Sequence, residues 1–399
     1  MENNQLIKHD GGLIKRVGNA ISVTNKLLAL AEPQLIPYRK KDKWGFCTPD
    51  KKIVIDCVWD EVEPFENGLA RVIKSKLFGF INTSGEIVIP IQYKYADAFF
   101  RSETVVNFKG KWGVYNKYCK KIVECIYESV GTFCEGLATV KLNHKYGYID
   151  LTGKIVIPTI YDFAWEFSNG LAKVEIANKF GFVNLNGLLC IDCIYDETDD
   201  FKEGLAMVSK NEKYGFVDKN GIEVVPLIYD LARGFSEGMA VVCFEDKCGY
   251  INNEYKIVIP MLYDFAYSFS EGLAAILIDS KWGFINLQGE IIIPCAYEEV
   301  GLGFVGGLVF ARTENGLGSF LDTRGQPLTS FIYEKYTSFY SNKMAVVEKN
   351  NKKGCIDKNG NTVLQCIYDF CFVNGDFILV SNHEGLGYIS KNGIKYWED

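Results

Sequence analysis

The chain has 399 residues, of which 48% are hydrophobic and 23% are charged, and its formal net charge at pH 7 is −7. This length and composition allow a large core to be buried. The negative charge, without a long block of lysine or arginine, argues against a nucleic-acid partner. No stretch reaches the roughly 18 consecutive apolar residues of a membrane-spanning helix, so no membrane span is predicted.

The first predicted element is an amphipathic helix over residues 11–31. Its apolar residues recur at about helical spacing: Leu13, Ile14, Val17, Ile21, Leu27 and Leu28. We expect residues 1–33 to form an N-terminal cap built on this helix, which could also serve as a docking element. A secretory signal is the alternative, because residues 27–31 end in small side chains, but Lys15 and Lys26 interrupt the apolar run that a signal needs.

From residue 34 onward the sequence repeats. A glycine that usually follows an aromatic residue recurs seven times at an interval of 34 residues and then at intervals of 35, 36 and 33. These glycines are Gly45, Gly79, Gly113, Gly147, Gly181, Gly215, Gly249, Gly283, Gly318, Gly354 and Gly387. The spacing predicts that residues 34–399 form an array of about eleven units of about 34 residues.

Three further columns keep the same register. They are a Gly-Leu-Ala element, a tyrosine followed by an acid, and a proline that closes an apolar run. Residues 281–285 (KWGFI) and 291–294 (IIIP) carry the motif most fully. Here the chain resembles the WG-repeat (KWG-repeat) proteins of bacteria, over about residues 34–399. The resemblance implies an interaction module without a family-wide enzymatic activity.

Each unit is predicted to be a three-stranded β-meander. In the second unit the strands are residues 69–73, 77–82 and 87–89, and proline ends the third strand because it cannot donate to a ladder. An Asp or Asn three residues before a glycine, as at Asn82 and Gly85, predicts the second hairpin turn. The remaining dozen residues are expected to be a connection packed by its own phenylalanine.

We expect an all-β repeat protein in which these units form an open, solenoid-like superhelical array. A β-propeller is the alternative, but propellers usually have about four to eight blades. The sequence starts on the first strand of a unit, at residues 35–38, and ends on the third, at residues 394–397, which leaves no split blade to seal a ring. The helix and the tail at residues 397–399 would then cap the exposed ends.

The thirteen cysteines are expected to be structural, although Cys190 and Cys193 have the spacing of a redox or zinc pair. Five of them stand two residues before the column Tyr or Trp, where other units carry apolar residues, so we expect these five to be buried, reduced and metal-free. They are Cys57, Cys125, Cys193, Cys295 and Cys366. Reduced thiols in such number are typical of a cytoplasmic protein.

No catalytic residue, cofactor or metal is predicted. Residues 301–306 match a dinucleotide-binding pattern by letter, but they lie where every other unit has its loop and Gly-Leu-Ala strand. The three histidines share no column. The acid of the Tyr-acid column, such as Asp162, is expected to accept hydrogen bonds from loop amides near the lysine column, such as Lys145. A carboxylate that recurs in nearly every unit indicates a scaffold role.

The positions after the Tyr-acid pair change most from unit to unit, and in repeat arrays such positions face partners. The aromatic residues there are the candidate partner-binding residues: Tyr95, Phe163, Trp165, Phe265 and Tyr267. The alternative is that they pack onto the next unit. We therefore expect a non-enzymatic scaffold or adaptor that binds another protein through variable inter-repeat loops. A carbohydrate or cell-envelope binding module is the second hypothesis.

Overall fold

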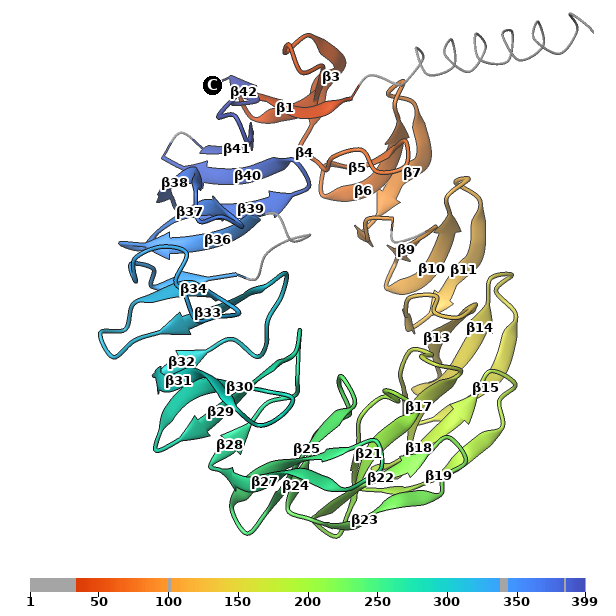
Figure 1. The fold of residues 1–399 in the computed structure, drawn as a ribbon. Coiled ribbons are helices and arrows are strands. Elements are labelled where there is room, and N and C mark those ends of the chain that lie inside the picture. Colours follow the sequence, from red (N-terminus) through yellow and green to blue (C-terminus); the bar gives the residue numbers. More distant parts are fainter. Residues whose placement is uncertain (1–33, 100–101, 338–343, 384, 399) are drawn as a thin grey trace, which may run out of the picture.

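A computed structural model describes residues 34–99, 102–337, 344–383 and 385–398. The helix predicted over residues 11–31, with the 1–33 cap, lies outside these ranges. Within them the protein is all β, with 42 strands and no helix. The strands form eleven sheets, called blades 1 to 11 in chain order, and the blades follow one another around a ring (Figure 1).

The strands of blade 1 are β1 (Ile36–Lys40), β2 (Lys43–Cys47), β3 (Ile53–Trp59) and β42 (Trp397–Glu398). Blades 2 to 5 contain β4 (Glu61–Val62), β5 (Leu69–Lys74), β6 (Leu77–Asn82), β7 (Ile87–Tyr93); β8 (Tyr95–Ala96), β9 (Glu103–Phe108), β10 (Lys111–Asn116), β11 (Lys121–Tyr127); β12 (Ser129–Val130), β13 (Leu137–Leu142), β14 (Lys145–Asp150), β15 (Ile155–Tyr161); β16 (Phe163–Ala164), β17 (Leu171–Ile176), β18 (Lys179–Asn184) and β19 (Leu189–Tyr195).

Blades 6 to 8 contain β20 (Glu197–Thr198), β21 (Leu205–Lys210), β22 (Lys213–Asp218), β23 (Glu223–Tyr229); β24 (Leu231–Ala232), β25 (Met239–Phe244), β26 (Lys247–Asn252), β27 (Ile257–Tyr263); β28 (Phe265–Ala266), β29 (Leu273–Ile278), β30 (Lys281–Asn286) and β31 (Ile291–Tyr297). Blades 9 to 11 contain β32 (Glu299–Val300), β33 (Leu308–Arg312), β34 (Gly318–Asp322); β35 (Lys335–Tyr336), β36 (Met344–Lys349), β37 (Lys352–Asp357), β38 (Thr362–Tyr368); β39 (Phe370–Asn374), β40 (Phe377–Asn382) and β41 (Gly385–Ser390).

A regular blade has four antiparallel strands, and the last three are the predicted meander. In blade 5, β16 pairs with β17, β17 with β18, and β18 with β19. The two-residue first strand was not predicted. It follows the fourth strand of the preceding blade almost at once, since β15 ends at Tyr161 and β16 begins at Phe163. The long fourth strands, such as β7, β15 and β23, lie on the outside of the ring (Figure 1).

The third strand predicted for each unit is the fourth strand of a blade. The prediction that proline ends this strand is wrong. Strand β15 continues through Pro158, and its pairing with β14 shifts between Tyr148↔Ile157 and Tyr146↔Tyr161. Proline is tolerated at such a bulge because no ladder hydrogen bond needs its missing N–H. The bulge crosses directly over Gly147, where a Cβ would lie 2.5 Å from the Ile157 carbonyl oxygen. This close approach explains the glycine column.

The blades pack on one another through the repeated aromatic residues. The column tyrosine is buried between blades, and Tyr161 is one example. The phenylalanine of each connection packs on the preceding blade, as Phe167 does on Tyr148, with ring centroids 4.8 Å apart. This confirms the prediction that each connection is packed by its own phenylalanine.

The ring is closed, so the prediction of an open array is wrong. Strand β42 pairs in parallel with β1, through Arg39↔Trp397 and Lys40↔Glu398. It occupies the edge of blade 1 where the other blades have their short first strand. The tail that was predicted to cap a free end therefore seals the ring, and the edge of β1 is covered by backbone pairing. The fold is an eleven-bladed β-propeller.

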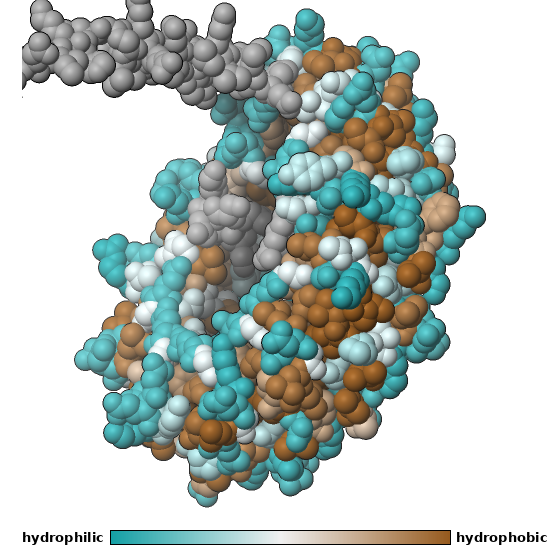
Figure 2. All heavy atoms as spheres, turned by 90° about the vertical axis from the view of Figure 1, so that its right-hand side faces the viewer, coloured by the Kyte–Doolittle hydropathy of each residue, from teal (hydrophilic) through white to brown (hydrophobic). Residues whose placement is uncertain are grey.

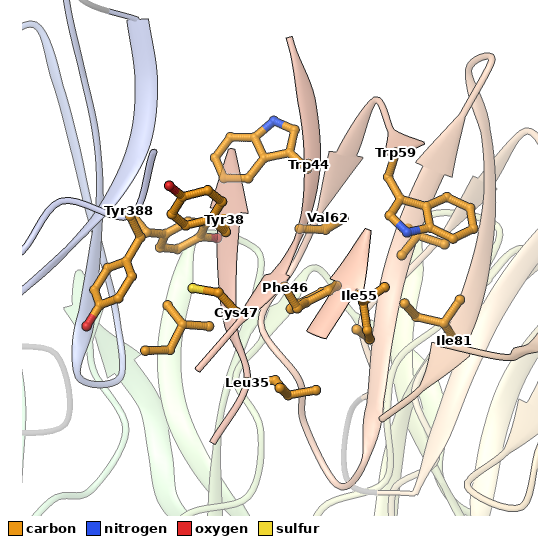
Figure 3. Packing of buried hydrophobic residues seen from close by; sticks show 14 residues of the cluster. Leu35, Tyr38, Trp44, Phe46, Cys47, Ile55, Trp59, Val62, Ile81 and Tyr388 are labelled. Atoms are coloured by element: carbon orange, nitrogen blue, oxygen red, sulfur yellow. The ribbon is translucent and has the colours of Figure 1, made fainter. Parts of the chain in front are cut away.

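Side chains reinforce this closure. The Tyr38 hydroxyl donates to a Glu398 carboxylate oxygen at 2.6 Å, and Arg39 Nε donates to the Leu386 carbonyl oxygen at 2.6 Å. The rings of Trp44 and Tyr388 meet edge to face at 5.9 Å. The core at this seam combines residues from both ends of the described chain (Figure 3). Blade 1 and blade 11 are thus held by core packing as well as by strand pairing.

The cysteines differ from the prediction in two respects. The five cysteines of the column are unbonded but only partly buried, so the expectation of full burial is wrong. Cys243 and Cys248, which face each other across β25 and β26, form a disulfide that was not predicted. Cys248 occupies the column that carries an aromatic residue in most blades. The disulfide therefore stands where other blades pair this aromatic residue with a non-aromatic one across the hairpin, as Phe180 with Glu175.

The outer face of the ring carries apolar side chains. The residue before the column tyrosine points outward on several fourth strands, and Ile126 and Ile160 are 53% and 55% exposed. Figure 2 shows hydrophobic patches over this side of the molecule, separated by hydrophilic residues.

Candidate functional site

The repeated carboxylates join neighbouring blades. In the junction of blades 6 and 7, Asp230 accepts a hydrogen bond from Lys213 Nζ at 2.6 Å and one from the Glu245 backbone N–H at 2.9 Å. The Lys213 ammonium and the Glu245 amide hold the pKa of Asp230 below its usual value. This confirms that the Tyr-acid column accepts hydrogen bonds from loop amides and from the lysine column.

A second set of carboxylates makes another contact between blades. The glutamate before the Gly-Leu-Ala element accepts a hydrogen bond from the glycine N–H of the following blade, as Glu237 does from Gly272 at 2.8 Å. Between blades 8 and 9 a serine adds a further hydrogen bond, because the Ser270 hydroxyl donates to the Phe304 carbonyl oxygen at 2.8 Å. Both repeated carboxylate columns are therefore occupied by structural hydrogen bonds.

The five predicted partner-binding residues do not form one patch. Each lies in a short first strand or directly after it, and the structure distributes them over blades 3, 5 and 8. We call the three groups the blade-3, blade-5 and blade-8 clusters. In each cluster a predicted residue contacts the aromatic residue that precedes the column glycine.

The blade-5 cluster lies beside a cavity of about 610 Å³ between blades 4 and 5. Phe163, which is 39% exposed, and Trp165 both line this cavity, and their ring centroids are 4.5 Å apart. Phe163 also packs on Tyr146 of blade 4 at 4.6 Å. The Lys173 ammonium lies 4.5 Å from the centre of the Trp165 ring. The cluster combines partly exposed aromatic rings with a cation.

The blade-8 cluster has the same composition with a different arrangement. Tyr267 stacks on Trp282 with centroids 5.1 Å apart, and Phe265 lies 5.4 Å from Tyr267. The Arg233 guanidinium of blade 7 lies 5.1 Å from Phe265 and 5.3 Å from Tyr267. Phe265 and Tyr267 therefore contact Trp282 of their own blade and Arg233 of the preceding blade.

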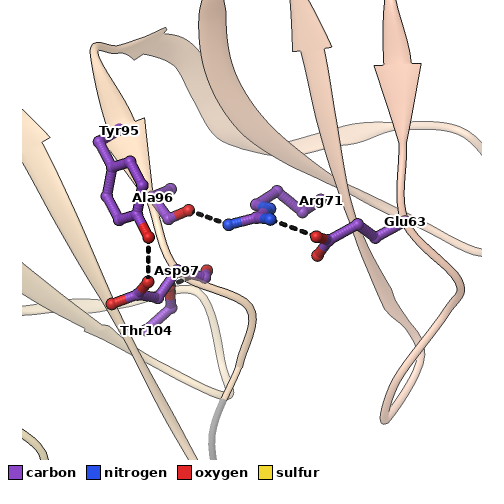
Figure 4. A network of polar contacts seen from close by, with 6 residues as sticks. All are labelled: Glu63, Arg71, Tyr95, Ala96, Asp97 and Thr104. Carbon is purple, nitrogen blue, oxygen red and sulfur yellow. Dashed lines mark hydrogen bonds and ion pairs between the residues drawn. The ribbon is translucent and has the colours of Figure 1, made fainter. Parts of the chain in front are cut away.

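The blade-3 cluster is more polar (Figure 4). Tyr95 is 42% exposed, and its hydroxyl donates to Asp97 at 2.7 Å. Arg71 of blade 2 bridges to blade 3, because its guanidinium donates both to Glu63 and to the Ala96 carbonyl oxygen. Each of the three clusters thus contains a lysine or arginine beside its aromatic rings. Arg71 and Lys173 directly follow a Gly-Leu-Ala element, and this position was not among the predicted site residues.

Residues 301–305 of the glycine-rich segment line another inter-blade cavity, of about 510 Å³, together with Phe310 and Tyr336. In the described part of the chain they are followed by strand β33 and not by a helix. Within the ranges that the structure describes, no group of three or more His, Cys, Asp or Glu side chains is placed to hold a metal ion. The same ranges contain no helix that is long and apolar enough to cross a membrane.

These features define a class of protein: a closed β-propeller whose blades are sequence repeats. The chain belongs to the family described as WG containing repeat. The family matches it ten times, at residues 44–77, 78–112, 112–146, 146–180, 180–214, 214–248, 249–282, 282–316, 319–352 and 354–393. The resemblance found in the sequence is thereby confirmed.

Known structures are similar to the chain only at a low level. Hsv2p of Kluyveromyces lactis is 11% identical, with a TM-score of 0.37, over 58% of this chain and 93% of that chain. BamB from Moraxella catarrhalis is 11% identical, with a TM-score of 0.35, over 72% of this chain and 93% of that chain. A eukaryotic initiation factor is 9% identical, with a TM-score of 0.38, over 90% of this chain and 93% of that chain. No curated protein sequence matches the chain.

Proposed function

We propose that the protein is a non-enzymatic scaffold or adaptor that binds another protein through its variable aromatic clusters. The observation that carries this proposal is the blade-5 cluster, where Phe163 and Trp165 line a cavity of about 610 Å³. The repeated side chains are used between blades, whereas these variable side chains stay partly exposed. Aromatic residues and arginine dominate the binding energy of protein interfaces. The net charge of −7 favours a protein partner over nucleic acid.

The test begins with a pull-down by the full chain, and the captured protein is then purified and its affinity measured. Replacing Trp165 and Tyr267 by alanine should weaken that affinity by at least about 30-fold, since each interface anchor contributes about 2 kcal/mol. A matched control is Tyr118→Ala, because Tyr118 is 78% exposed and lies outside the three clusters. The control variant should bind the partner as the wild type does.

Two outcomes would contradict the proposal. Unchanged affinity in a correctly folded double variant would exclude these clusters as the binding surface. A fall of many degrees in melting temperature would show that the two side chains hold blades together. If the chain instead retains polysaccharide, and the double variant loses it, the carbohydrate or cell-envelope hypothesis replaces this one. Fractionation of the source cells tests the proposed cytoplasmic location.

A further inference from the structure

Two cysteines from different blades meet in the core near the seam. Cys355 lies in β37 of blade 10 and Cys371 in β39 of blade 11. Their sulfur atoms are 3.1 Å apart, and the two residues are 0% and 7% exposed. A disulfide bond is about 2.0 Å long, so the sulfurs need to approach by only about 1 Å to bond.

The register of the repeats shows that this pair replaces an inter-blade contact. In regular blades the residue after the column glycine is usually a large aromatic, and it packs beside the small second residue of the next short strand. Tyr148 and Ala164 form such a pair between blades 4 and 5. Cys355 and Cys371 occupy these same two columns. At the junction of blades 10 and 11, both columns of this inter-blade contact therefore carry cysteine.

We propose that Cys355 and Cys371 are a redox-sensitive pair that forms a reversible disulfide between blades 10 and 11, with hydrogen peroxide as the oxidant. Peroxide is close to water in size, which suits a buried site. Its reaction with the Cys371 thiol gives a sulfenic acid and one molecule of water. The Cys355 sulfur then attacks the sulfenic sulfur, and the hydroxyl leaves with the Cys355 proton as a second water. Two thiols are oxidised, and one peroxide is reduced.

The order of the two steps follows from the surroundings of each sulfur. The hydrogen bond with Cys371, together with burial, raises the pKa of the Cys355 thiol. Since the thiolate is the nucleophile, Cys355 is the less reactive partner toward peroxide, and it is also the less exposed. Cys371 is therefore the first to react. The product differs from the disulfide of blade 7, which joins two strands of one hairpin.

The test uses the full chain, reduced and then treated with hydrogen peroxide, blocked with a thiol alkylator in denaturant, and digested with trypsin without reductant. Cys355 lies in the tryptic peptide 354–358, and Cys371 lies with Cys366 in the peptide 359–391. We expect these two peptides to be linked, with a loss of two hydrogen atoms in mass, and to separate on reduction. The link should raise the melting temperature of the oxidised protein.

Two variants identify the sulfur that takes part. Cys366→Ala should keep the linked peptides and the rise in melting temperature, whereas Cys371→Ala should lose both. The proposal is overturned if the wild type shows no link at a peroxide dose that oxidises the partly buried Cys190, a result that requires no variant to fold. It is equally overturned if the link survives in Cys371→Ala, because the bond would then run to Cys366.

Discussion

The four-stranded blades and the three-stranded blades 9 and 11 solve the same packing problem with different groups. In the regular blades the column glycine is covered by the backbone of the bulged fourth strand, as the Ile191 carbonyl oxygen covers Gly181. In blades 9 and 11 side chains cover it instead: Phe310 lies over Gly318, and Trp397 lies over Gly387. The column position must therefore be glycine wherever backbone or a side chain lies closely over it, both in blades that have a fourth strand and in blades that lack one.

The largest expected effect comes from placing a methyl group under the backbone bulge. In Gly181→Ala the Cβ would lie 2.3 Å from the Ile191 carbonyl oxygen and 2.8 Å from the Cys193 nitrogen. Backbone cannot yield as a flexible side chain can, so the free energy of unfolding should fall by about 3 kcal/mol or more. Denaturant-induced unfolding measures this loss.

The matched control is Gly170→Ala. Gly170 has a φ of +83°, and a Cβ added there would meet nothing within 4 Å. The variant therefore carries only the cost of the left-handed backbone, about 1 kcal/mol. An equal loss in the two variants would show that backbone conformation, and not the bulge, explains the glycine column.

The second effect concerns the seam alone. Replacing Trp397 and Glu398 by alanine removes the ring over Gly387 and the hydrogen bond to Tyr38. Because Trp397 is only partly buried, we expect a loss of about 2 kcal/mol, below that of a core aromatic. The radius of gyration from X-ray scattering should increase as the ring opens.

Trp112→Ala in blade 3 is the control for the seam variant, since Trp112 is a partly buried aromatic of a regular blade. It should lower stability without changing the radius of gyration. If the seam variant keeps the dimensions of the wild type, the shared core and the backbone pairing of β42 with β1 are enough to hold blade 11 to blade 1.

The third expected effect is specific to blade 7 and does not apply to the other regular blades. Its hairpin is closed by the Cys243–Cys248 disulfide, with a sequence separation of 5. Replacing both cysteines by alanine should cost about 2 kcal/mol, the value expected for so short a loop. Reductant should lower the melting temperature of the wild type and leave that of the double variant unchanged. The same response to reductant in both would contradict this assignment.

The smallest effect is a dependence on pH at the junctions whose acid column carries an aspartate. The Lys145 ammonium and the Ala177 amide lower the pKa of Asp162, and Lys213 and Glu245 do the same for Asp230. A carboxylate with a lowered pKa stabilises the fold fully above its unfolded pKa of about 3.9, and this contribution is lost as the pH falls through the lower, folded pKa.

The wild type should therefore lose stability as the pH falls below about 4, which the midpoint of denaturant unfolding measures. An Asp162→Asn and Asp230→Asn double variant should lose less over that range. Asp56→Asn, which changes an exposed carboxylate of β3, should keep the dependence of the wild type. A double variant as acid-sensitive as the wild type would show that other carboxylates govern the response.

The sequence was sufficient to predict only part of what recurs, since the short first strand is present in most blades and was missed. The hairpin from Asp150 to Gly153 is present, with the Gly153 N–H donating to the Asp150 carbonyl oxygen at 2.9 Å, and the acid column makes the expected hydrogen bonds. What occurs once was missed. The pairing of β42 with β1 joins segments separated by nearly the whole chain, and no periodicity encodes it.

For the candidate site, the predicted residues were partly exposed as expected, but their grouping was not foreseen. A column indicates which face of a blade a residue occupies, whereas the curvature of the ring decides which columns of different blades approach one another. Phe163 and Phe265 share a column, but they lie in separate clusters because Phe163 belongs to blade 5 and Phe265 belongs to blade 8.

The pairing of β1 with β42 also fixes an order of events during synthesis. The Tyr38 hydroxyl donates to Glu398, which lies 360 residues further along the chain, so this hydrogen bond forms only after Glu398 has been synthesised. Each regular blade can fold as soon as its own residues and those of its neighbour have left the ribosome, since its contacts are local. Blade 1 emerges first and is completed last, so the edge of β1 stays open to other strands until the final residues of the ring arrive.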